Sequence, residues 1–162
     1  MKLTTVTLAV AACIALPAAA QAPEAVTPKT GKAAMTYKGT GLLNYECKTV
    51  DGKTAWTFAG PDAKLTDGGK EVGKYYAGPT WELADGSKIT GKQLATAPGA
   101  AGAIPLQLVE TTPATGKGKL EGVKHIQRLN TVGGVAPSDP CDASKVGEKK
   151  TVGYSADYVF FK

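Results

Sequence analysis

Apolar and polar residues alternate along many short stretches of this chain, which is the period of a β-strand that buries one face. The clearest case is Leu42–Lys48, where Leu43, Tyr45 and Cys47 fall on one face and polar residues fall on the other. Further segments fit the same strand pattern: Trp56–Phe58, Lys64–Thr66, Glu71–Tyr76, Thr80–Ala84, Ser87–Thr90, Leu106–Thr112, Val123–Asn130, Lys150–Tyr154 and Asp157–Phe161.

Glycine and proline interrupt the pattern so often that long helices are excluded. The chain has 20 Gly and 10 Pro, and its longest uninterrupted stretches in the folded part are Leu42–Asp51 and Val123–Val132. Asp-Gly steps within Asp67–Lys70 and at Asp85 favour tight hairpins, because these residues tolerate positive φ. Only Asp142–Val146, with Asp142 as an N-cap, is suited to a helical turn.

These features predict an all-β fold, an antiparallel β-sandwich or barrel of about nine short strands with long Gly/Pro-rich loops. The segments between the predicted strands lack the helical crossovers that a parallel sheet needs. The two longest gaps are Gly91–Pro105 and Gly133–Pro140, and loops of that length are often functional.

The first twenty residues have the pattern of a cleaved signal peptide. Lys2 is followed by an uncharged stretch, Leu3–Leu16, and by small residues that favour cleavage before Gln21. The alternatives are a membrane anchor and a lipoprotein signal ending at Cys13. Residues 21–36 are rich in Ala, Pro, Thr and Lys and indicate a flexible tether, and residues 37–162 then form a single domain. We therefore expect a periplasmic or secreted protein without a membrane span in its mature chain.

Cleavage changes the charge and cysteine counts. Loss of residues 1–20 leaves 18 Lys and Arg against 14 Asp and Glu, a net charge of +4. All but one of these cations are lysines scattered among acids, which favours a solvated surface over nucleic-acid binding. Cys47 and Cys141 remain, and an even pair in an oxidising compartment favours a disulfide over two free thiols.

Few residues are suited to metal or cofactor chemistry, and we expect neither. His125 is the only histidine of the chain. It shares its strand face with apolar residues, so packing at the core or rim is the favoured role. No serine or cysteine lies in a nucleophile elbow.

A binding role needs fewer residues than catalysis, and two groups of side chains suit it. Aromatic residues flank a Gly-Pro turn, and a polar set ends the strand before a Gly-rich loop. Arg128, the only arginine, can bind a carboxylate through two parallel hydrogen bonds. Alternatively, the aromatics fill the core and Arg128 pairs with Asp157 or Glu82 as an internal strut. The predicted ligand-binding residues are Tyr76, Trp81, Glu82, Gln127, Arg128 and Asn130.

The main alternative is an enzyme. Glu82 and Asp157 lie in predicted strands, and two carboxyl groups held about 5 to 9.5 Å apart can hydrolyse a glycosidic bond. The alternative function is therefore a carboxylate-dependent hydrolase acting on extracellular or cell-wall carbohydrate.

Three segments, together with Tyr45–Cys47 and Cys141-Asp142, resemble a family of secreted proteins catalogued as domain of unknown function 3455. They are Val72–Glu82, Ile126–Gly134 and Tyr154–Tyr158, in the family's order. The resemblance implies export, a single domain and pairing of the two cysteines, but no activity. Many members carry a His in the motif before Ala-Gly-Pro, where this chain has Tyr75.

Our interpretation from sequence is an exported, non-catalytic binding or envelope-associated module. We expect no catalytic residue unless the hydrolase alternative holds. The expected partner is a small molecule, a glycan or an envelope protein.

Overall fold

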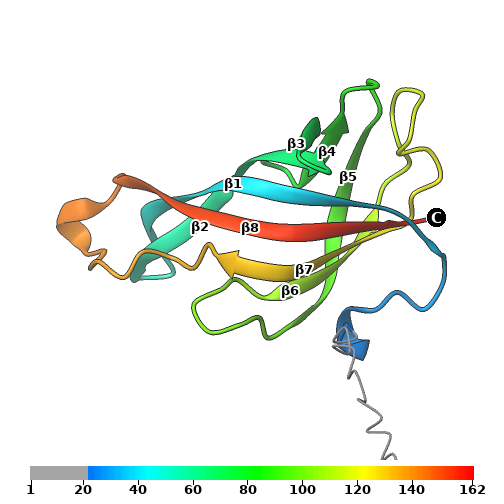
Figure 1. Cartoon of the computed structure of the whole chain (residues 1–162). Coiled ribbons are helices and arrows are strands. Elements are labelled where there is room, and N and C mark those ends of the chain that lie inside the picture. The colour runs from blue at the N-terminus through cyan, green and yellow to red at the C-terminus, as the bar shows by residue number, and fades with distance from the viewer. Residues whose placement is uncertain (1–21) are drawn as a thin grey trace, which may run out of the picture.

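The strands close into a single antiparallel barrel, in which each strand pairs with its neighbours in sequence and β1 pairs with β8 (Figure 1). The computed structural model describes residues 22–162. The predicted signal peptide lies outside the described residues. The elements are η1 (Glu24–Val26), β1 (Ala33–Val50), β2 (Lys53–Asp67), β3 (Lys70–Tyr76), β4 (Thr80–Leu83), β5 (Lys88–Ala97), β6 (Leu106–Thr111), β7 (His125–Gly133), η2 (Ala143–Lys145) and β8 (Lys149–Phe161).

The all-β prediction is confirmed, and of its two architectures the structure has the barrel. The strands are fewer and longer than expected. Trp56–Phe58 and Lys64–Thr66 are parts of one strand, β2, because Gly60 lies at a β-bulge instead of ending the strand. Lys150–Tyr154 and Asp157–Phe161 likewise join in β8.

Glycines inside the strands are explained by crowding within a narrow barrel. A Cβ added to Gly41 would lie 2.2 Å from the carbonyl oxygen of Asp62, and one on Gly39 would lie 2.5 Å from the ring of Tyr158. Only glycine therefore fits at these two positions. In other strands, by contrast, a glycine often weakens or interrupts the strand.

Aromatic rings fill the middle of the barrel. Tyr75 stacks on Trp81 with ring centroids 4.5 Å apart, and Tyr158 contacts both at 5.1 and 5.9 Å. All three side chains are buried. Burial raises the pKa of Tyr75 and of Tyr158, because an ionised phenolate would be poorly solvated there.

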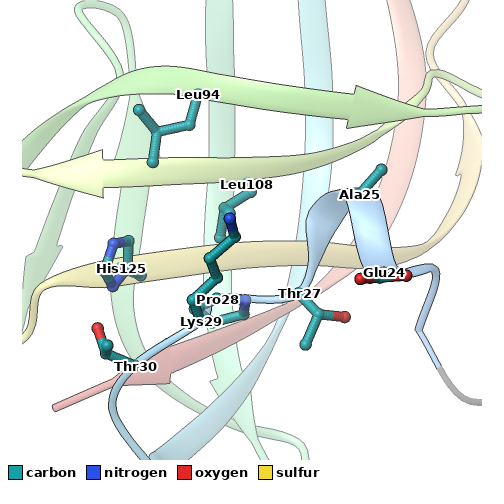
Figure 2. A pocket seen from close by; sticks show the side chains of 9 residues that line it. All are labelled: Glu24, Ala25, Thr27, Pro28, Lys29, Thr30, Leu94, Leu108 and His125. Atoms are coloured by element: carbon teal, nitrogen blue, oxygen red, sulfur yellow. The ribbon is translucent and has the colours of Figure 1, made fainter.

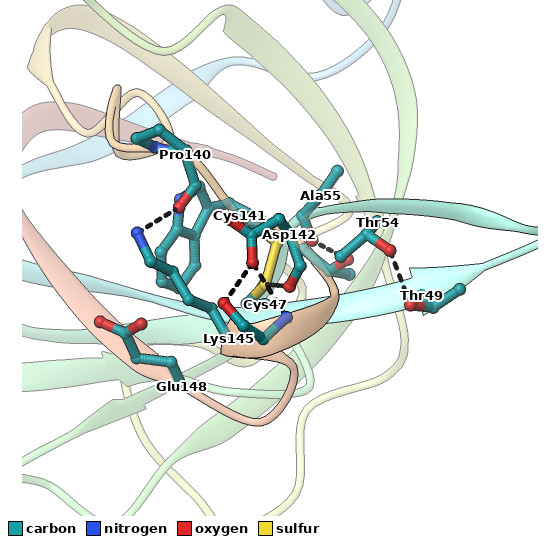
Figure 3. The surroundings of a disulfide bond; sticks show 12 residues. Cys47, Thr49, Thr54, Ala55, Pro140, Cys141, Asp142, Lys145 and Glu148 are labelled. Atoms are coloured by element: carbon teal, nitrogen blue, oxygen red, sulfur yellow. Dashed lines mark hydrogen bonds between the residues drawn. A yellow bond between two sulfur atoms is a disulfide. The ribbon is translucent and has the colours of Figure 1, made fainter.

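A disulfide fastens the long loop between β7 and β8 to the last turn-side residues of β1. Cys47 bonds to Cys141, 94 positions later, as the sequence predicted (Figure 3). The indole of Trp56 donates to the carbonyl oxygen of Asp139 at 2.8 Å, which holds the same loop. The ammonium group of Lys150 lies over the Trp56 ring and also pairs with Asp139. Together these contacts hold the loop against β1, β2 and β8.

The short helical turn predicted at Asp142–Val146 is confirmed as η2. The carboxylate of Asp142 accepts a hydrogen bond from the backbone N–H of Ser144 at 2.9 Å. This is the N-cap contact that favours the turn.

The N-terminal segment, expected as a tether over residues 21–36, contains η1 and the first residues of β1. Val26 is fully buried outside the barrel, in a small cluster with Ala97 and Leu108. Val26 stands among Pro, Thr and Lys without any periodic pattern of apolar residues. The sequence therefore did not indicate that it packs against the barrel.

Candidate functional site: a groove between the N-terminal segment and the barrel wall

The predicted ligand-binding residues of β3 and β4 lie on opposite sides of the barrel wall. Trp81 is fully buried inside the barrel, and its indole nitrogen has no hydrogen-bond partner among the described residues. Glu82 points outward because side chains alternate along a strand. The hydroxyl of Tyr76 donates to Glu82 at 2.6 Å, and Lys74 lies 3.6 Å from the same carboxylate. The Tyr76 hydrogen bond, and next the nearby lysines, lower the pKa of Glu82.

The predicted polar residues of β7, Gln127, Arg128 and Asn130, also point to different places. The buried side-chain amide of Gln127 donates to the carbonyl oxygen of Val26 at 2.7 Å, so it holds the N-terminal segment. Asn130 donates to Asp157 at 2.7 Å. Arg128 faces inward and is described next. The six predicted residues therefore do not converge on one site.

Arg128 shares a face with the buried Tyr158, its partner across the strand pair. Its guanidinium donates twice to the carbonyl oxygen of Pro105, at 3.2 and 2.9 Å. Burial raises the pKa of Tyr75, and the positive charge of Arg128 partly opposes that shift. The arginine thus supports the loop between β5 and β6, and it pairs with neither Glu82 nor Asp157 among the described contacts.

The structure does not bring together the two carboxylates of the hydrolase alternative. Glu82 is on β4 and Asp157 is on β8, and three strands separate these two in either direction around the barrel. Both point outward, next to buried inward-facing neighbours. They share no cleft in which one could act as acid and the other as base.

A groove on the outer wall is the candidate site that the structure adds. It has a volume of about 560 Å³ and lies between the N-terminal segment and strands β5, β6 and β7 (Figure 2). This volume is in the range of small-molecule sites, about 300 to 1,000 Å³. The lining residues are Glu24, Ala25, Thr27, Pro28, Lys29, Thr30, Leu94, Leu108 and His125.

A β-bulge directs Leu94 into this groove. The pairing of β5 with β6 shifts between Gln93 and Ala95, so Leu94 is the extra residue. Its side chain is 51% exposed. Bulges often re-aim a side chain at a functional site. From the sequence, Gly91–Pro105 was predicted as a loop of a length that is often functional, whereas β5 continues to Ala97, and Leu94 was not singled out.

His125 lies at the other side of the groove floor, at the start of β7. Its Nδ1 atom is buried and has no hydrogen-bond partner among the described residues. The nitrogen that a bound molecule can reach is therefore Nε2. Lys29 extends across the groove toward Leu108, and Glu24 lies at the opposite end from His125 (Figure 2).

The N-terminal segment forms the outer rim of the groove, and it is attached to the barrel at two places. Val26 docks into the cluster with Ala97 and Leu108, and Gln127 binds its carbonyl. Farther along, Lys32 exchanges two backbone hydrogen bonds with Lys162, at 2.8 and 3.1 Å. The rim is thus fixed at both ends of the groove.

Comparison with known protein families matches residues 28–162 to the family described as "Protein of unknown function (DUF3455)". The chain belongs to this family. The DUF3455 match includes most of the groove, from Pro28 to His125, and begins just after Val26. No curated protein and no solved structure matches the chain at a significant level.

Two further features bear on the site of this DUF3455 protein. Among residues 22–162, no group of three or more His, Cys, Asp or Glu side chains is placed to hold a metal ion. No helix in the same range is long and apolar enough to cross a membrane.

Proposed function

We propose that this DUF3455 chain is an exported, non-catalytic binding module, and that its ligand is a small carboxylic acid with an apolar body, bound in the groove of Figure 2. The observation that carries the proposal is the groove itself, which combines a bulged leucine with the only imidazole of the chain. Pockets with an apolar floor and a few polar groups are typical of ligand sites.

The apolar part of the ligand would lie on Leu94, Leu108 and Pro28. Leu94 is half exposed without a ligand, and covering it would remove apolar surface from water. That burial is favourable by roughly 25 cal/mol per Å². An aliphatic chain or a single aromatic ring supplies such a surface.

The acidic part would lie near His125, and the exposed Lys29 at the rim adds a positive charge to the groove. Nε2 of an imidazole and the ammonium of a lysine can both donate to a carboxylate. Glu24, the acidic side chain of the lining, lies at the opposite end, so it does not repel an anion at this position (Figure 2). The polarity of the groove therefore favours one orientation of the ligand.

Sodium octanoate is a suitable probe, titrated by calorimetry into the folded domain. Leu94→Asp places a charge in the apolar floor, and Leu42→Asp is the matched control because Leu42 is a 44% exposed leucine on the wall of β1. We expect binding by the unmodified protein and by Leu42→Asp, and at least tenfold weaker binding by Leu94→Asp.

His125→Gln tests the polar end. The substitution should weaken octanoate more than octanol, because only the acid uses the imidazole. Equal octanoate affinity in all variants, or no binding by the unmodified protein, would contradict the proposal.

Export is supported by the disulfide and by the uncharged stretch that follows Lys2. Disulfides persist in oxidising compartments and are rare in the cytosol. Mass spectrometry of the protein recovered from the periplasm or medium should show a chain beginning at Gln21. A full-length or lipid-modified chain would contradict this part of the proposal.

A further inference from the structure

The fold gathers lysines at one end of the barrel, although the sequence scatters them. This end carries the β2–β3 and β4–β5 turns, the loop between β6 and β7, the start of β1 and the end of β8, because the strands run alternately up and down. We call it the lysine end. Its seven exposed lysines are Lys32, Lys70, Lys88, Lys117, Lys119, Lys124 and Lys162.

Backbone contacts tie these segments to one another. Lys88 exchanges backbone hydrogen bonds of 2.8 Å with Thr115 in the long loop, and Lys124 donates to Phe161 at 2.8 Å. A cavity of about 420 Å³ is lined by residues that include Lys119 and Lys162. The lysines therefore belong to one surface.

The acids at this end are too few to neutralise the lysines. They are Asp67, Asp85 and Glu121. Asp85 accepts hydrogen bonds from the backbone and hydroxyl of Ser87 and from the backbone of Lys119, and Glu121 accepts from a backbone N–H. None of the seven lysines forms an ion pair among the described residues.

By the formal charges of the side chains, the lysine end carries the whole excess of positive charge of residues 22–162. Seven lysines against three acids give +4, and residues 22–162 contain 18 cations against 14 acids, which is also +4. The rest of the barrel is therefore balanced. Such a one-sided distribution orients a protein toward an anionic surface.

We propose that the lysine end docks on a lipid surface that carries phosphate head groups. The surface has lysines without arginine and no exposed aromatic ring among its described residues, whereas nucleic-acid sites favour arginine forks and stacking rings. The exposed large apolar side chains lie outside these turns, so docking is by charge without insertion. This inference does not depend on the groove.

Sedimentation with vesicles tests it. The full chain should bind vesicles of phosphatidylglycerol mixed with phosphatidylcholine, not bind pure phosphatidylcholine, and be released by salt. Charge reversal at Lys117 and Lys124 should weaken binding by on the order of a few hundredfold, because each unit charge contributes about fivefold. The matched control reverses Lys53 and Lys149, which are exposed and lie toward the other end of the barrel.

Thermal unfolding of both double variants checks that they fold. An equal loss in the two variants would show that net charge, and not this surface, governs binding. Equal binding to both kinds of vesicle, no binding, or tighter binding to duplex DNA than to the anionic vesicles at the same salt would each overturn the inference.

Discussion

Val26 holds the N-terminal segment against the barrel, and we predict that shortening it opens the groove without unfolding the protein. The side chain is fully buried, although it lies outside the main core. Val26→Ala removes two buried methylene equivalents, which costs about 1.6 kcal/mol in transfer free energy. The cavity left behind raises the total to about 2 to 3 kcal/mol.

The other contact that holds the segment near Val26 is too weak to compensate for this loss of docking free energy. The hydrogen bond from Gln127 to the Val26 carbonyl contributes about 1 kcal/mol. The loss therefore raises the undocked fraction of the segment by roughly 30-fold to 150-fold, since about 1.4 kcal/mol is a factor of ten. The segment's other anchor, at Lys32, stays in place.

Hydrogen exchange followed by mass spectrometry measures the effect directly. Peptides covering residues 22–32 should exchange faster by that factor in Val26→Ala, while peptides from the barrel strands stay protected. Val146→Ala is the control because Val146 is 52% exposed, in a different loop. Unchanged exchange in residues 22–32, or an equal increase in every strand, would refute the reasoning.

Three further outcomes are expected. Loss of the Cys47–Cys141 disulfide should lower the free energy of unfolding in urea by up to about 4 to 5 kcal/mol, because the bond closes a long loop; no change in midpoint would contradict this. Gly41→Ala should lower the melting temperature strongly and Gly153→Ala should not, since only the first added Cβ meets a neighbouring strand. Hydrogen bonds, foremost from the backbone of the facing loop, lower the pKa of Asp85 below its ordinary 3.8, so its stabilisation is present above that pH and is lost as pH falls through the folded pKa. Asp85→Asn should therefore flatten the acid limb of the stability curve, and an unchanged slope would count against this contact.

Much of the fold could be predicted because alternation is a local signal. Leu43, Tyr45 and Cys47 were expected on one buried face, and all three are buried. The hairpin at Asp67–Lys70 was also expected, and it joins β2 to β3. Barrel closure is not local, because the pairing of β1 with β8 joins the two ends of the chain. The need for glycine at position 39 could not be recognised without knowing that the ring of Tyr158 on β8 packs against it.

The candidate site was harder to predict, since single residues with no period define it. The predicted set included Gln127, which the structure uses to bind the N-terminal segment. Arg128 was left open between a ligand contact and an internal strut, and its observed partner is the Pro105 carbonyl. Val26 has no sequence signal that marks it as functional, and Leu94 was covered only by the general interest of the Gly91–Pro105 stretch. Their importance follows only from which strands they meet.

Chemical-shift mapping by NMR with sodium octanoate tests the central claim most directly. The binding account predicts that shifts in backbone amides saturate together and cluster at Lys29, Leu94, Leu108 and His125, around the groove of the outer wall. Shifts centred instead on the inner face near Arg128, or no saturable shift anywhere, would contradict it.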